Sequence, residues 1–337
     1  MTNDNIMNAA KSCRKYLIDM YAPKGFIFGN NILSFVINLK SKSSKEYRRR
    51  MKINEPLSKY TTLGLGGPAD CMIDVPDMAG LKKALLFVKR QKLPLTLLGG
   101  GSNVLVKDGG IRGLVIRLKE SFCGIKVKGA ELVCGGGATL SGAVIIAAAK
   151  GLTGLEFAAG IPGTVGGAVV MNAGANGGEI KDVVKSITVI DRNAKVKKLT
   201  CKKAGFKYRG AKFAKKGGLI VIEAAFKLKK SSKQAVKARI FELLTKRKLS
   251  QPPCRGTAGS VFKNPKGFFA GRLIDECGLK GKKIGKAEIS MKHGNFFVNR
   301  GKSAEDYLKL IDFVKKTVLK KTGVKLAEEI KILGEDK

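Results

Sequence analysis

The sequence predicts an α+β protein in which a cofactor-binding half is followed by a reactive half. Strand-like and helix-like segments alternate from about residue 54, and glycine-rich stretches at 99–103 and 160–168 interrupt them. Roughly a hundred residues further on, 259–265 reads Gly-Ser-Val-Phe-Lys-Asn-Pro and brings together a hydroxyl, an ammonium group and an amide. The 337 residues, 44% of them apolar, are enough for two or three domains.

Residues 1–50 are predicted to be a basic N-terminal extension of unknown role. They end in Lys-Glu-Tyr-Arg-Arg-Arg, and the regular pattern begins only after Met51. Two interpretations stay open, a short basic appendage or a misassigned start with Met51 as the true first residue. The apolar stretch 26–39 is too short to span a bilayer, and no secretory signal is convincing. We therefore expect a cytoplasmic protein without a membrane span.

The first structured unit is expected at about 54–118. Asp77 precedes a helical pattern at 81–91 and can cap it, because its carboxylate accepts hydrogen bonds from N–H groups of the first turn. A short strand at 95–98, expected to be buried, runs into the first glycine stretch. Further strands are expected at 71–75, 104–106 and 114–118, with a turn at 108–110.

A second unit of strands and helices follows. Its alanine-rich helix at 140–150 is expected to stop at Gly151, because glycine readily adopts the left-handed conformation that ends a helix. Strands are expected at 131–134, 186–191 and 219–228, and a helix at about 233–248 leads to the last domain.

The last domain, at roughly 250–330, is expected to contain one long amphipathic helix. Ser303 and Asp306 have the spacing of a capping box at its start, and Gly323 ends it. Apolar side chains at helical spacing on one face are interpreted as core packing; they are Tyr307, Leu310, Ile311, Val314 and Val318.

Each glycine-rich stretch has a functional and a structural interpretation. Consecutive glycines at 99–103, followed by serine and asparagine, let several N–H groups converge on an anion, so this stretch is a diphosphate cradle or a tight turn. It has neither the Rossmann nor the Walker A spacing. The stretch 160–168 is a flat surface for a planar ring system and its phosphates, or a structural crossover. The glycines at 64–67 follow no clear strand and are a weaker signal.

Composition narrows the classes of function. The formal net charge of +39 raises a nucleic-acid hypothesis, but the lysines are spread along the chain without a nucleic-acid-binding motif, and an anionic small substrate fits the same charge. Seven cysteines without a Cys-x-x-Cys pair indicate a reducing compartment. The single histidine, His293, argues against a histidine metal site or a Ser-His-Asp triad, and we expect no metal.

Three segments carry groups suited to an anionic substrate. Arg209, beside Tyr208, offers a planar cation to a carboxylate or enolate, although the pair also fits an ordinary surface position. Ser260 could donate a proton, and the absence of a neighbouring histidine base argues against a nucleophilic hydrolase. Glu328 or Glu329 could return a carboxylate to the site, or both could belong to a salt-bridged strand.

Taken in order, these segments resemble the UDP-N-acetylenolpyruvoylglucosamine reductases, the flavoenzymes known as MurB. The resemblance covers about 54–334, and the chain looks like the shorter type II form, because 174–208 has no room for the extra tyrosine loop of the other type. The stretches that carry the resemblance are 60–70, 99–106, 154–157, 160–167, 171–174, 208–209, 258–265, 295–299 and 326–330.

The resemblance implies an FAD-binding fold of the vanillyl-alcohol-oxidase (PCMH) type and a C-terminal α+β substrate-binding domain. The FAD-binding domain would span 51–232, with subdomains at about 51–118 and 119–232, and the C-terminal domain would span 250–334. It also implies noncovalent FAD, NADPH and reduction of enolpyruvyl-UDP-N-acetylglucosamine to UDP-N-acetylmuramate for peptidoglycan. We expect a monomer or weak dimer with no specific nucleic-acid partner.

The resemblance assigns roles to individual residues. Hydride would pass from FAD N5 to C3 of the enolpyruvyl group, Ser260 would protonate C2, and Arg209 and Glu329 would flank the carboxylate. The residues expected to contact FAD are Tyr60, Thr61, Thr62, Gly66, Gly67, Gly99, Gly100, Gly101, Ser102, Asn103, Ile161, Gly163, Thr164, Gly167 and Ala168. Those expected to contact the substrate are Tyr208, Arg247, Gln251, Lys263 and Asn264.

Some positions depart from the family pattern, and alternatives to it stay open. Ala211, Gly256, Thr257 and Ala327 replace residues that are usual in the family, which affects the substrate loop more than the chemistry. The alternatives are another flavin enzyme of the same fold, such as an oxidase, a nucleic-acid-binding protein without flavin, and a noncatalytic homologue.

Overall fold

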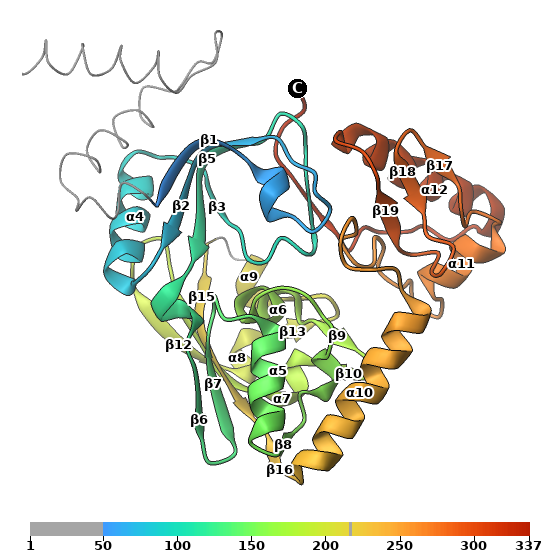
Figure 1. Ribbon diagram of the computed structural model, residues 1–337. Helices are drawn as coiled ribbons and strands as arrows, with labels where there is room; N and C mark the ends of the chain where they lie inside the picture. The colour runs from blue at the N-terminus through green and yellow to red at the C-terminus, as the bar shows by residue number, and fades with distance from the viewer. Residues whose placement is uncertain (1–49, 216–217) are drawn as a thin grey trace, which may run out of the picture.

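The computed structural model describes residues 50–215 and 218–337, which form three α/β parts (Figure 1). The first part is a four-stranded sheet in the order β1-β2-β5-β3, in which β1 is antiparallel to β2 and the other neighbours are parallel. Its strands are β1 (Met51–Pro56), β2 (Pro68–Val75), β5 (Ile111–Leu118) and β3 (Leu95–Leu97). The short helices η1 (Leu57–Tyr60) and η2 (Glu120–Cys123) flank the sheet.

Helix α4 (Met78–Arg90) covers this sheet and forms as the sequence predicts. Asp77 caps it, since its Oδ1 accepts a hydrogen bond from Gly80 N at 2.7 Å. The apolar face of the helix packs on the sheet through Leu81 and Leu85. The prediction of a buried strand at 95–98 was wrong for Leu97, which is 38% exposed because it borders a cavity.

The second part is a five-stranded antiparallel sheet with helices on one face (Figure 1). Its strand order is β12-β11-β15-β7-β6, with β12 (Val196–Thr200), β11 (Val184–Ile190), β15 (Ile220–Lys227), β7 (Glu131–Gly135) and β6 (Ile125–Lys128). Helices α5 (Leu140–Ala149) and α6 (Val165–Met171) pack on its apolar face. Gly151, at φ 64°, follows α5 as predicted.

The second part also contains several short strands and helices between its longer elements. They are β8 (Leu152–Thr153), which pairs with β16 (Lys229–Lys230), the hairpin of β9 (Gly174–Ala175) with β10 (Gly178–Glu179), the hairpin of β13 (Phe206–Lys207) with β14 (Gly210–Ala211), η3 (Glu156–Ala158), α7 (Ile180–Val183), α8 (Cys201–Ala204) and α9 (Lys212–Lys215).

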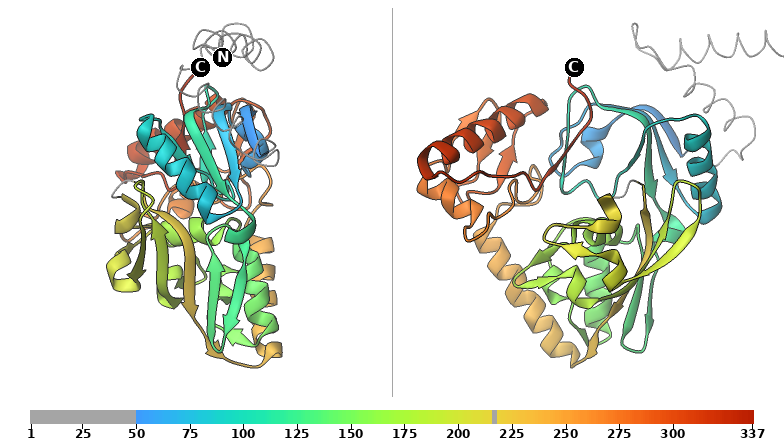
Figure 2. Two further views of the ribbon diagram at one scale, coloured as in Figure 1. Left: turned by 90° about the vertical axis from the view of Figure 1, so that its left-hand side faces the viewer. Right: turned by 180° about the vertical axis from the view of Figure 1, so that it is seen from behind.

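Helix α10 (Lys233–Ser250) runs from the second part to the third, as Figure 1 and the right-hand view of Figure 2 show. The third part is a small antiparallel sheet in the order β17-β18-β19, packed against two helices. Its elements are β17 (Lys283–Ile284), β18 (Ala287–Ile289), β19 (Phe297–Asn299), α11 (Ala270–Glu276) and α12 (Ala304–Thr322). The predicted apolar stripe of α12 is fully buried, and Gly323 ends the helix at φ 69°.

The start of α12 differs from the predicted capping box. Ser303 is the N-cap, but Asp306 does not reach back to it; its Oδ2 accepts a hydrogen bond from Lys286 N at 2.8 Å instead. Asp108 of the first part binds the Ser303 hydroxyl at 2.6 Å and the Ala304 N–H at 2.9 Å. Sequence spacing therefore identified Ser303 as the N-cap, whereas tertiary contacts determine the hydrogen-bond partners of Ser303 and Asp306.

The chain end returns to the first part, where β20 (Lys331–Leu333) pairs in parallel with β4 (Val104–Val106). The apolar core of the third part also includes Leu63, Leu65 and Leu105 from the first. The two parts therefore share a core, and the predicted domain limits stay a prediction. The predicted extension lies outside the described residues except for Arg50. Among the described helices, none combines the length and apolarity that crossing a membrane requires.

Candidate functional site

A cavity of about 680 Å³ lies where the three parts meet, and most predicted site residues line it. Its wall comes from the loop after β3, the segment around the start of α6, the last turn of α10 and the Ser260 loop. Predicted residues in this lining are Gly99, Gly100, Gly101, Ser102, Asn103, Ile161, Gly163, Thr164, Gly167, Ala168, Arg209, Arg247, Gln251, Ser260 and Glu329.

One wall consists of two glycine-rich loops packed against each other. A Cβ on Gly100 would lie 2.6 Å from Gly163 Cα, and one on Gly99 would lie 2.8 Å from Thr164 Oγ1. The Ser102 hydroxyl donates to Pro162 O at 2.9 Å and ties the loops together. Side chains on these glycines would force the loops apart, so the glycines are required by loop packing as well as by access to a ligand.

The glycine wall has the chemistry that a flavin dinucleotide needs. Within the described chain, no backbone carbonyl accepts a hydrogen bond from the N–H groups of Gly100, Gly101 or Ser102. These amides therefore remain available to an anion such as a diphosphate. A second cavity of about 300 Å³ shares Gly99, Thr164 and Gly167 with the first, and Arg117, Lys119 and Arg192 line it. The residues present thus fit FAD.

The segment 60–67 supports the glycine wall from outside the cavity lining. A Cβ on Gly101 would lie 1.9 Å from Tyr60 O, and Thr62 N donates to Gly101 O at 3.0 Å. The Tyr60 ring has Arg117 above it at 4.5 Å, and its hydroxyl donates to Glu55. Thr61 is buried, and its hydroxyl donates to Leu65 O at 2.7 Å.

Gly66 and Gly67 also lie outside the cavity lining and serve chain packing. Gly67 has Asp108 O where a Cβ would stand, at 2.1 Å, and Gly66 has φ 139° beside Val106. The predicted contacts of residues 60–67 with FAD stay a prediction, because these residues support the glycine loops instead of lining the cavity.

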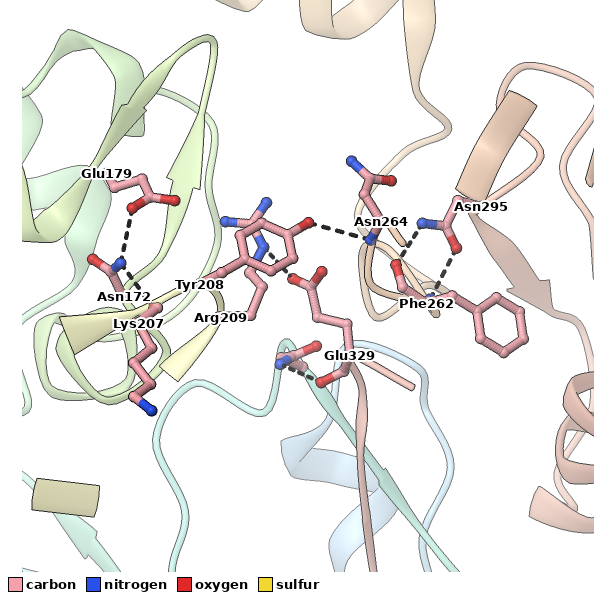
Figure 3. Close-up of polar contacts among 10 residues, drawn as sticks. Asn172, Glu179, Lys207, Tyr208, Arg209, Phe262, Asn264, Asn295 and Glu329 are labelled. Atoms are coloured by element: carbon pink, nitrogen blue, oxygen red, sulfur yellow. Dashed lines mark hydrogen bonds and ion pairs between the residues drawn. The ribbon is translucent and has the colours of Figure 1, made fainter. Parts of the chain in front are cut away.

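A second wall of the cavity contains an ion pair between Arg209 and Glu329. Arg209 Nε lies 2.9 Å from Glu329 Oε1, and both side chains are mostly buried (Figure 3). Burial raises the pKa of the Glu329 carboxyl, while Arg209 and Lys263 act in the opposite direction. Asn103 Nδ2 donates to the backbone carbonyl oxygen of Glu329 at 3.4 Å, so the glycine wall contacts the segment that carries this carboxylate.

Ser260 lies on a loop held by a buried asparagine. Asn295 Oδ1 accepts from Phe262 N at 2.9 Å, and its Nδ2 donates to Phe262 O at 2.7 Å (Figure 3). Ser260 also forms a β-bridge with Phe296, and Glu329 N donates to Val261 O at 2.8 Å. The Ser260 loop is thereby anchored beside the segment that carries Glu329.

Three predicted substrate residues lie outside the cavity lining. The Tyr208 hydroxyl accepts from Asn264 N at 3.3 Å, which links the β13–β14 turn to the third part (Figure 3). Asn264 is exposed, and its Oδ1 accepts from Ala270 N at 3.0 Å. Lys263 is close enough to Glu329 to lower the pKa of that carboxyl. The contacts of these three residues with substrate stay a prediction.

Arg247, in the last turn of α10, favours an anion in the cavity, and Gln251, directly after the helix, favours a hydrogen-bond donor. Burial lowers the pKa of Arg247 from its ordinary value, and Gln251 Oε1 is buried without a hydrogen-bond partner in the described chain. Lys246 and Lys331 also line the cavity and were missed by sequence reasoning. In a chain with lysines throughout, nothing in the local pattern distinguishes these two.

Comparison with known proteins agrees with this geometry. Residues 69–200 match an FAD binding domain, and residues 251–333 match the C-terminal domain of UDP-N-acetylenolpyruvoylglucosamine reductase. The reductases of Desulforamulus reducens and Clostridium novyi are each 43% identical, over 85% and 90% of this chain and 94% and 99% of their own.

A solved structure supports the same assignment. The crystal structure of MurB from Thermus caldophilus is similar at 39% identity with a TM-score of 0.72, covering 84% of this chain and 97% of that one. The expected FAD-binding fold, followed by the C-terminal domain of these reductases, is confirmed. The chain belongs to the UDP-N-acetylenolpyruvoylglucosamine reductase family.

Proposed function

We propose that this chain reduces the enolpyruvyl ether of UDP-N-acetylglucosamine to UDP-N-acetylmuramate, with NADPH as reductant and FAD as noncovalent cofactor. Family membership supports the reaction. The observation that carries it is that Ser260, Arg209 and Glu329 line the same cavity as the glycine wall. When bound, FAD supplies the hydride chemistry between NADPH and C3 of the enolpyruvyl group.

Arg209 is proposed to hold the substrate carboxylate. Reduction at C3 moves the electron pair of the double bond toward C2 and the carboxylate, where a planar guanidinium stabilises the added charge. Because Arg209 is mostly buried, this attraction is weakened less by water than at a surface site. Arg209 thus stabilises the enolate-like intermediate, and the transition state that leads to it, more than the starting substrate, as catalysis requires.

Glu329 is proposed to exchange its ion pair with Arg209 for a proton when the substrate carboxylate binds, and then to act in its neutral form. Burial already raises the pKa of its carboxyl, and a substrate carboxylate beside it would raise that pKa further. A neutral Glu329 can donate a hydrogen bond to the substrate carboxylate, which an ionised one cannot. The rate of substrate reduction therefore falls as the pH rises through the pKa of Glu329.

Ser260 is proposed to give its hydroxyl proton to C2. A serine hydroxyl is a weak acid in water, so the step requires the hydroxyl to be held at the carbon and the carbon to be strongly basic. The anchoring of its loop by Asn295 and by the backbone of Glu329 supports such a fixed position. The serine alkoxide that remains is reprotonated from solvent in the same cycle.

Arg247 and Gln251 are proposed to bind the UDP part of the substrate. Arg247 brings a cation into the cavity, and no acidic residue of the described chain forms a salt bridge with it. A diphosphate would supply the missing negative charge. The type II form and the oligomeric state stay predictions.

The test uses the visible spectrum of the purified protein under anaerobic conditions. A flavin band that bleaches with NADPH and returns with enolpyruvyl-UDP-N-acetylglucosamine supports both half-reactions. A band that bleaches but returns only with oxygen would favour an oxidase. No flavin, even after reconstitution with FAD, would contradict the proposal and favour the charge-based alternative.

A further inference from the structure

Arg209 has a backbone conformation that it does not prefer. It is the second residue of the two-residue turn between β13 and β14, and its φ is 53°. A side chain with a Cβ is strained in this left-handed region, so the surroundings must hold it there. Whatever fixes this turn also fixes the direction of the Arg209 guanidinium.

The side chain of Asn172 holds the strand that leads into this turn. Its Nδ2 donates to Lys207 O at 3.1 Å, directly before Tyr208 (Figure 3). The same Nδ2 donates to Glu179 Oε2 at 2.9 Å, and its Oδ1 accepts from Lys181 N at 2.9 Å. Asn172 is fully buried, so loss of these bonds would leave polar groups without water to replace them.

Asn172 also ends the helix that begins at the glycine wall. It is the C-cap of α6 with φ 44°, and Thr164 caps the same helix at its start. Below the arginine, a Cβ on Gly174 would lie 3.3 Å from Arg209 Nη1 and 2.8 Å from Glu179 Cγ. The β9–β10 hairpin thus lies against the guanidinium, and Asn172 joins that hairpin to the turn.

We propose that Asn172 is a positioning residue that holds Arg209 toward the substrate carboxylate through its bond to Lys207 O. The inference rests on the proposed role of Arg209 and deepens it. Without this bond the turn can relax toward a negative φ, which moves the guanidinium away from Glu329 and from the substrate. The proposal gives Arg209 a role only in the reduction of the substrate, so flavin reduction by NADPH should be insensitive to Asn172.

Two substitutions separate the side-chain bonds from the backbone requirement. Asn172→Gly keeps the positive φ and removes the bonds, while Asn172→Asp keeps an acceptor for Lys181 N and removes both donors. Asn54→Gly is the matched control, because Asn54 also has a positive φ (52°) and lies in β1, away from the turn.

The expected result is a defect confined to the substrate. Both Asn172 variants should bind FAD and be bleached by NADPH at rates within about twofold of the parent, whereas reoxidation by the enolpyruvyl substrate should slow about 10- to 100-fold, as misplacement of a catalytic group does. Calorimetry should show about a tenfold loss of preference for UDP-N-acetylmuramate, which has the carboxylate, over UDP-N-acetylglucosamine, which lacks it. Asn54→Gly should change none of these.

A donor–acceptor exchange tests which bond matters. In Asn172→Asp with Glu179→Gln, the glutamine amide can donate to the new carboxylate, so the hairpin contact is restored while Lys207 O still has no donor. This double variant should fold and bind FAD but remain slow with substrate. Recovery of the parental rate would overturn the proposal, because the bond to Lys207 would then be dispensable.

Arg209→Lys distinguishes failure of the inference from failure of the proposed function. If Arg209→Lys slows reoxidation and Asn172→Gly does not, the positioning role is wrong and the role of Arg209 survives. If Arg209→Lys leaves reoxidation unchanged, the proposed role of Arg209 is wrong. Equal loss of FAD binding and of both half-reactions in Asn172→Gly, with none in Asn54→Gly, would mean a purely structural residue and also contradict the inference.

Discussion

The two walls of the cavity are built on different principles. The glycine wall uses backbone from two loops, 99–103 and 160–168, that are each continuous in sequence. The second wall uses single side chains from three segments that are distant in sequence, Arg209, Ser260 and Glu329. A backbone surface tolerates almost no added atom, whereas a side-chain site depends on how separate segments are held. Substitutions on the glycine wall should therefore impair FAD binding, whereas substitutions on the side-chain wall should impair substrate reduction.

The largest expected effect is at Ser260, on the side-chain wall. Ser260→Ala should lower the rate of substrate reduction about 10²- to 10⁴-fold, the range that general acid catalysis supplies, with FAD binding and NADPH oxidation unchanged. Ser260→Cys should keep part of the turnover, because a thiol also carries a transferable proton. Full activity in Ser260→Ala, measured by stopped-flow reoxidation, would exclude proton donation.

On the glycine wall, Gly100→Ala should abolish tight FAD binding. The added methyl group would stand 2.6 Å from Gly163 Cα, so the two loops must separate and the cradle changes shape. We expect an apparent FAD dissociation constant raised at least about 100-fold, measured by fluorescence titration of the apoprotein. Gly124→Ala is the control, because its Cβ meets nothing closer than Ser121 O at 3.9 Å. Equal affinities in the two variants would argue against tight loop packing.

Glu329 gives the side-chain wall a pH dependence that the glycine wall lacks. Its folded-state pKa is raised above the ordinary 4.5, so above pH 4.5 the folded chain binds more protons at this site than the unfolded chain. The stability contributed by this group is therefore present at low pH and declines as the pH rises through the raised pKa.

Urea denaturation of the apoprotein as a function of pH measures this contribution. Glu329→Gln should remove it, so the difference in unfolding free energy between variant and parent should grow in favour of the variant as the pH rises from 4.5. The same variant should lose the decline in substrate reduction with pH. A difference that is constant with pH would mean that Glu329 has an ordinary pKa.

The smallest expected effects concern two threonine N-caps, where the loss of folding stability can be compared with the loss of FAD affinity. Thr164 caps α6 and lines the cavity, whereas Thr139 caps α5 and does not, through similar bonds of 3.2 and 3.1 Å to a backbone N–H. The two residues are neighbours that form a β-bridge, so they differ mainly in access to the cavity. Replacing either by alanine should cost about 1 kcal/mol of unfolding free energy. Only Thr164→Ala should also weaken FAD binding, by a few-fold. A change in FAD affinity in Thr139→Ala would show that stability alone controls binding.

Much of the secondary structure and the chemical inventory of the site could be predicted from the sequence. The helix after Asp77, the stop at Gly151 and the buried stripe of α12 all depend on spacing within one segment, which local periodicity reports. Most of the site residues that line the cavity are predicted by motifs and by the family resemblance, because glycine runs and the order Ser-Val-Phe-Lys-Asn are readable without coordinates.

Only the tertiary structure decided how these segments meet. Asp306 binds Lys286 N and not its own cap, the glycines at 66–67 serve chain packing, and Arg209 faces a carboxylate 120 positions later in the chain. The bond from Asn172 to Lys207 O is equally invisible in the sequence. Periodicity and turn chemistry are local, whereas each of these contacts depends on packing between segments far apart, and that packing determines which polar group is left facing the cavity.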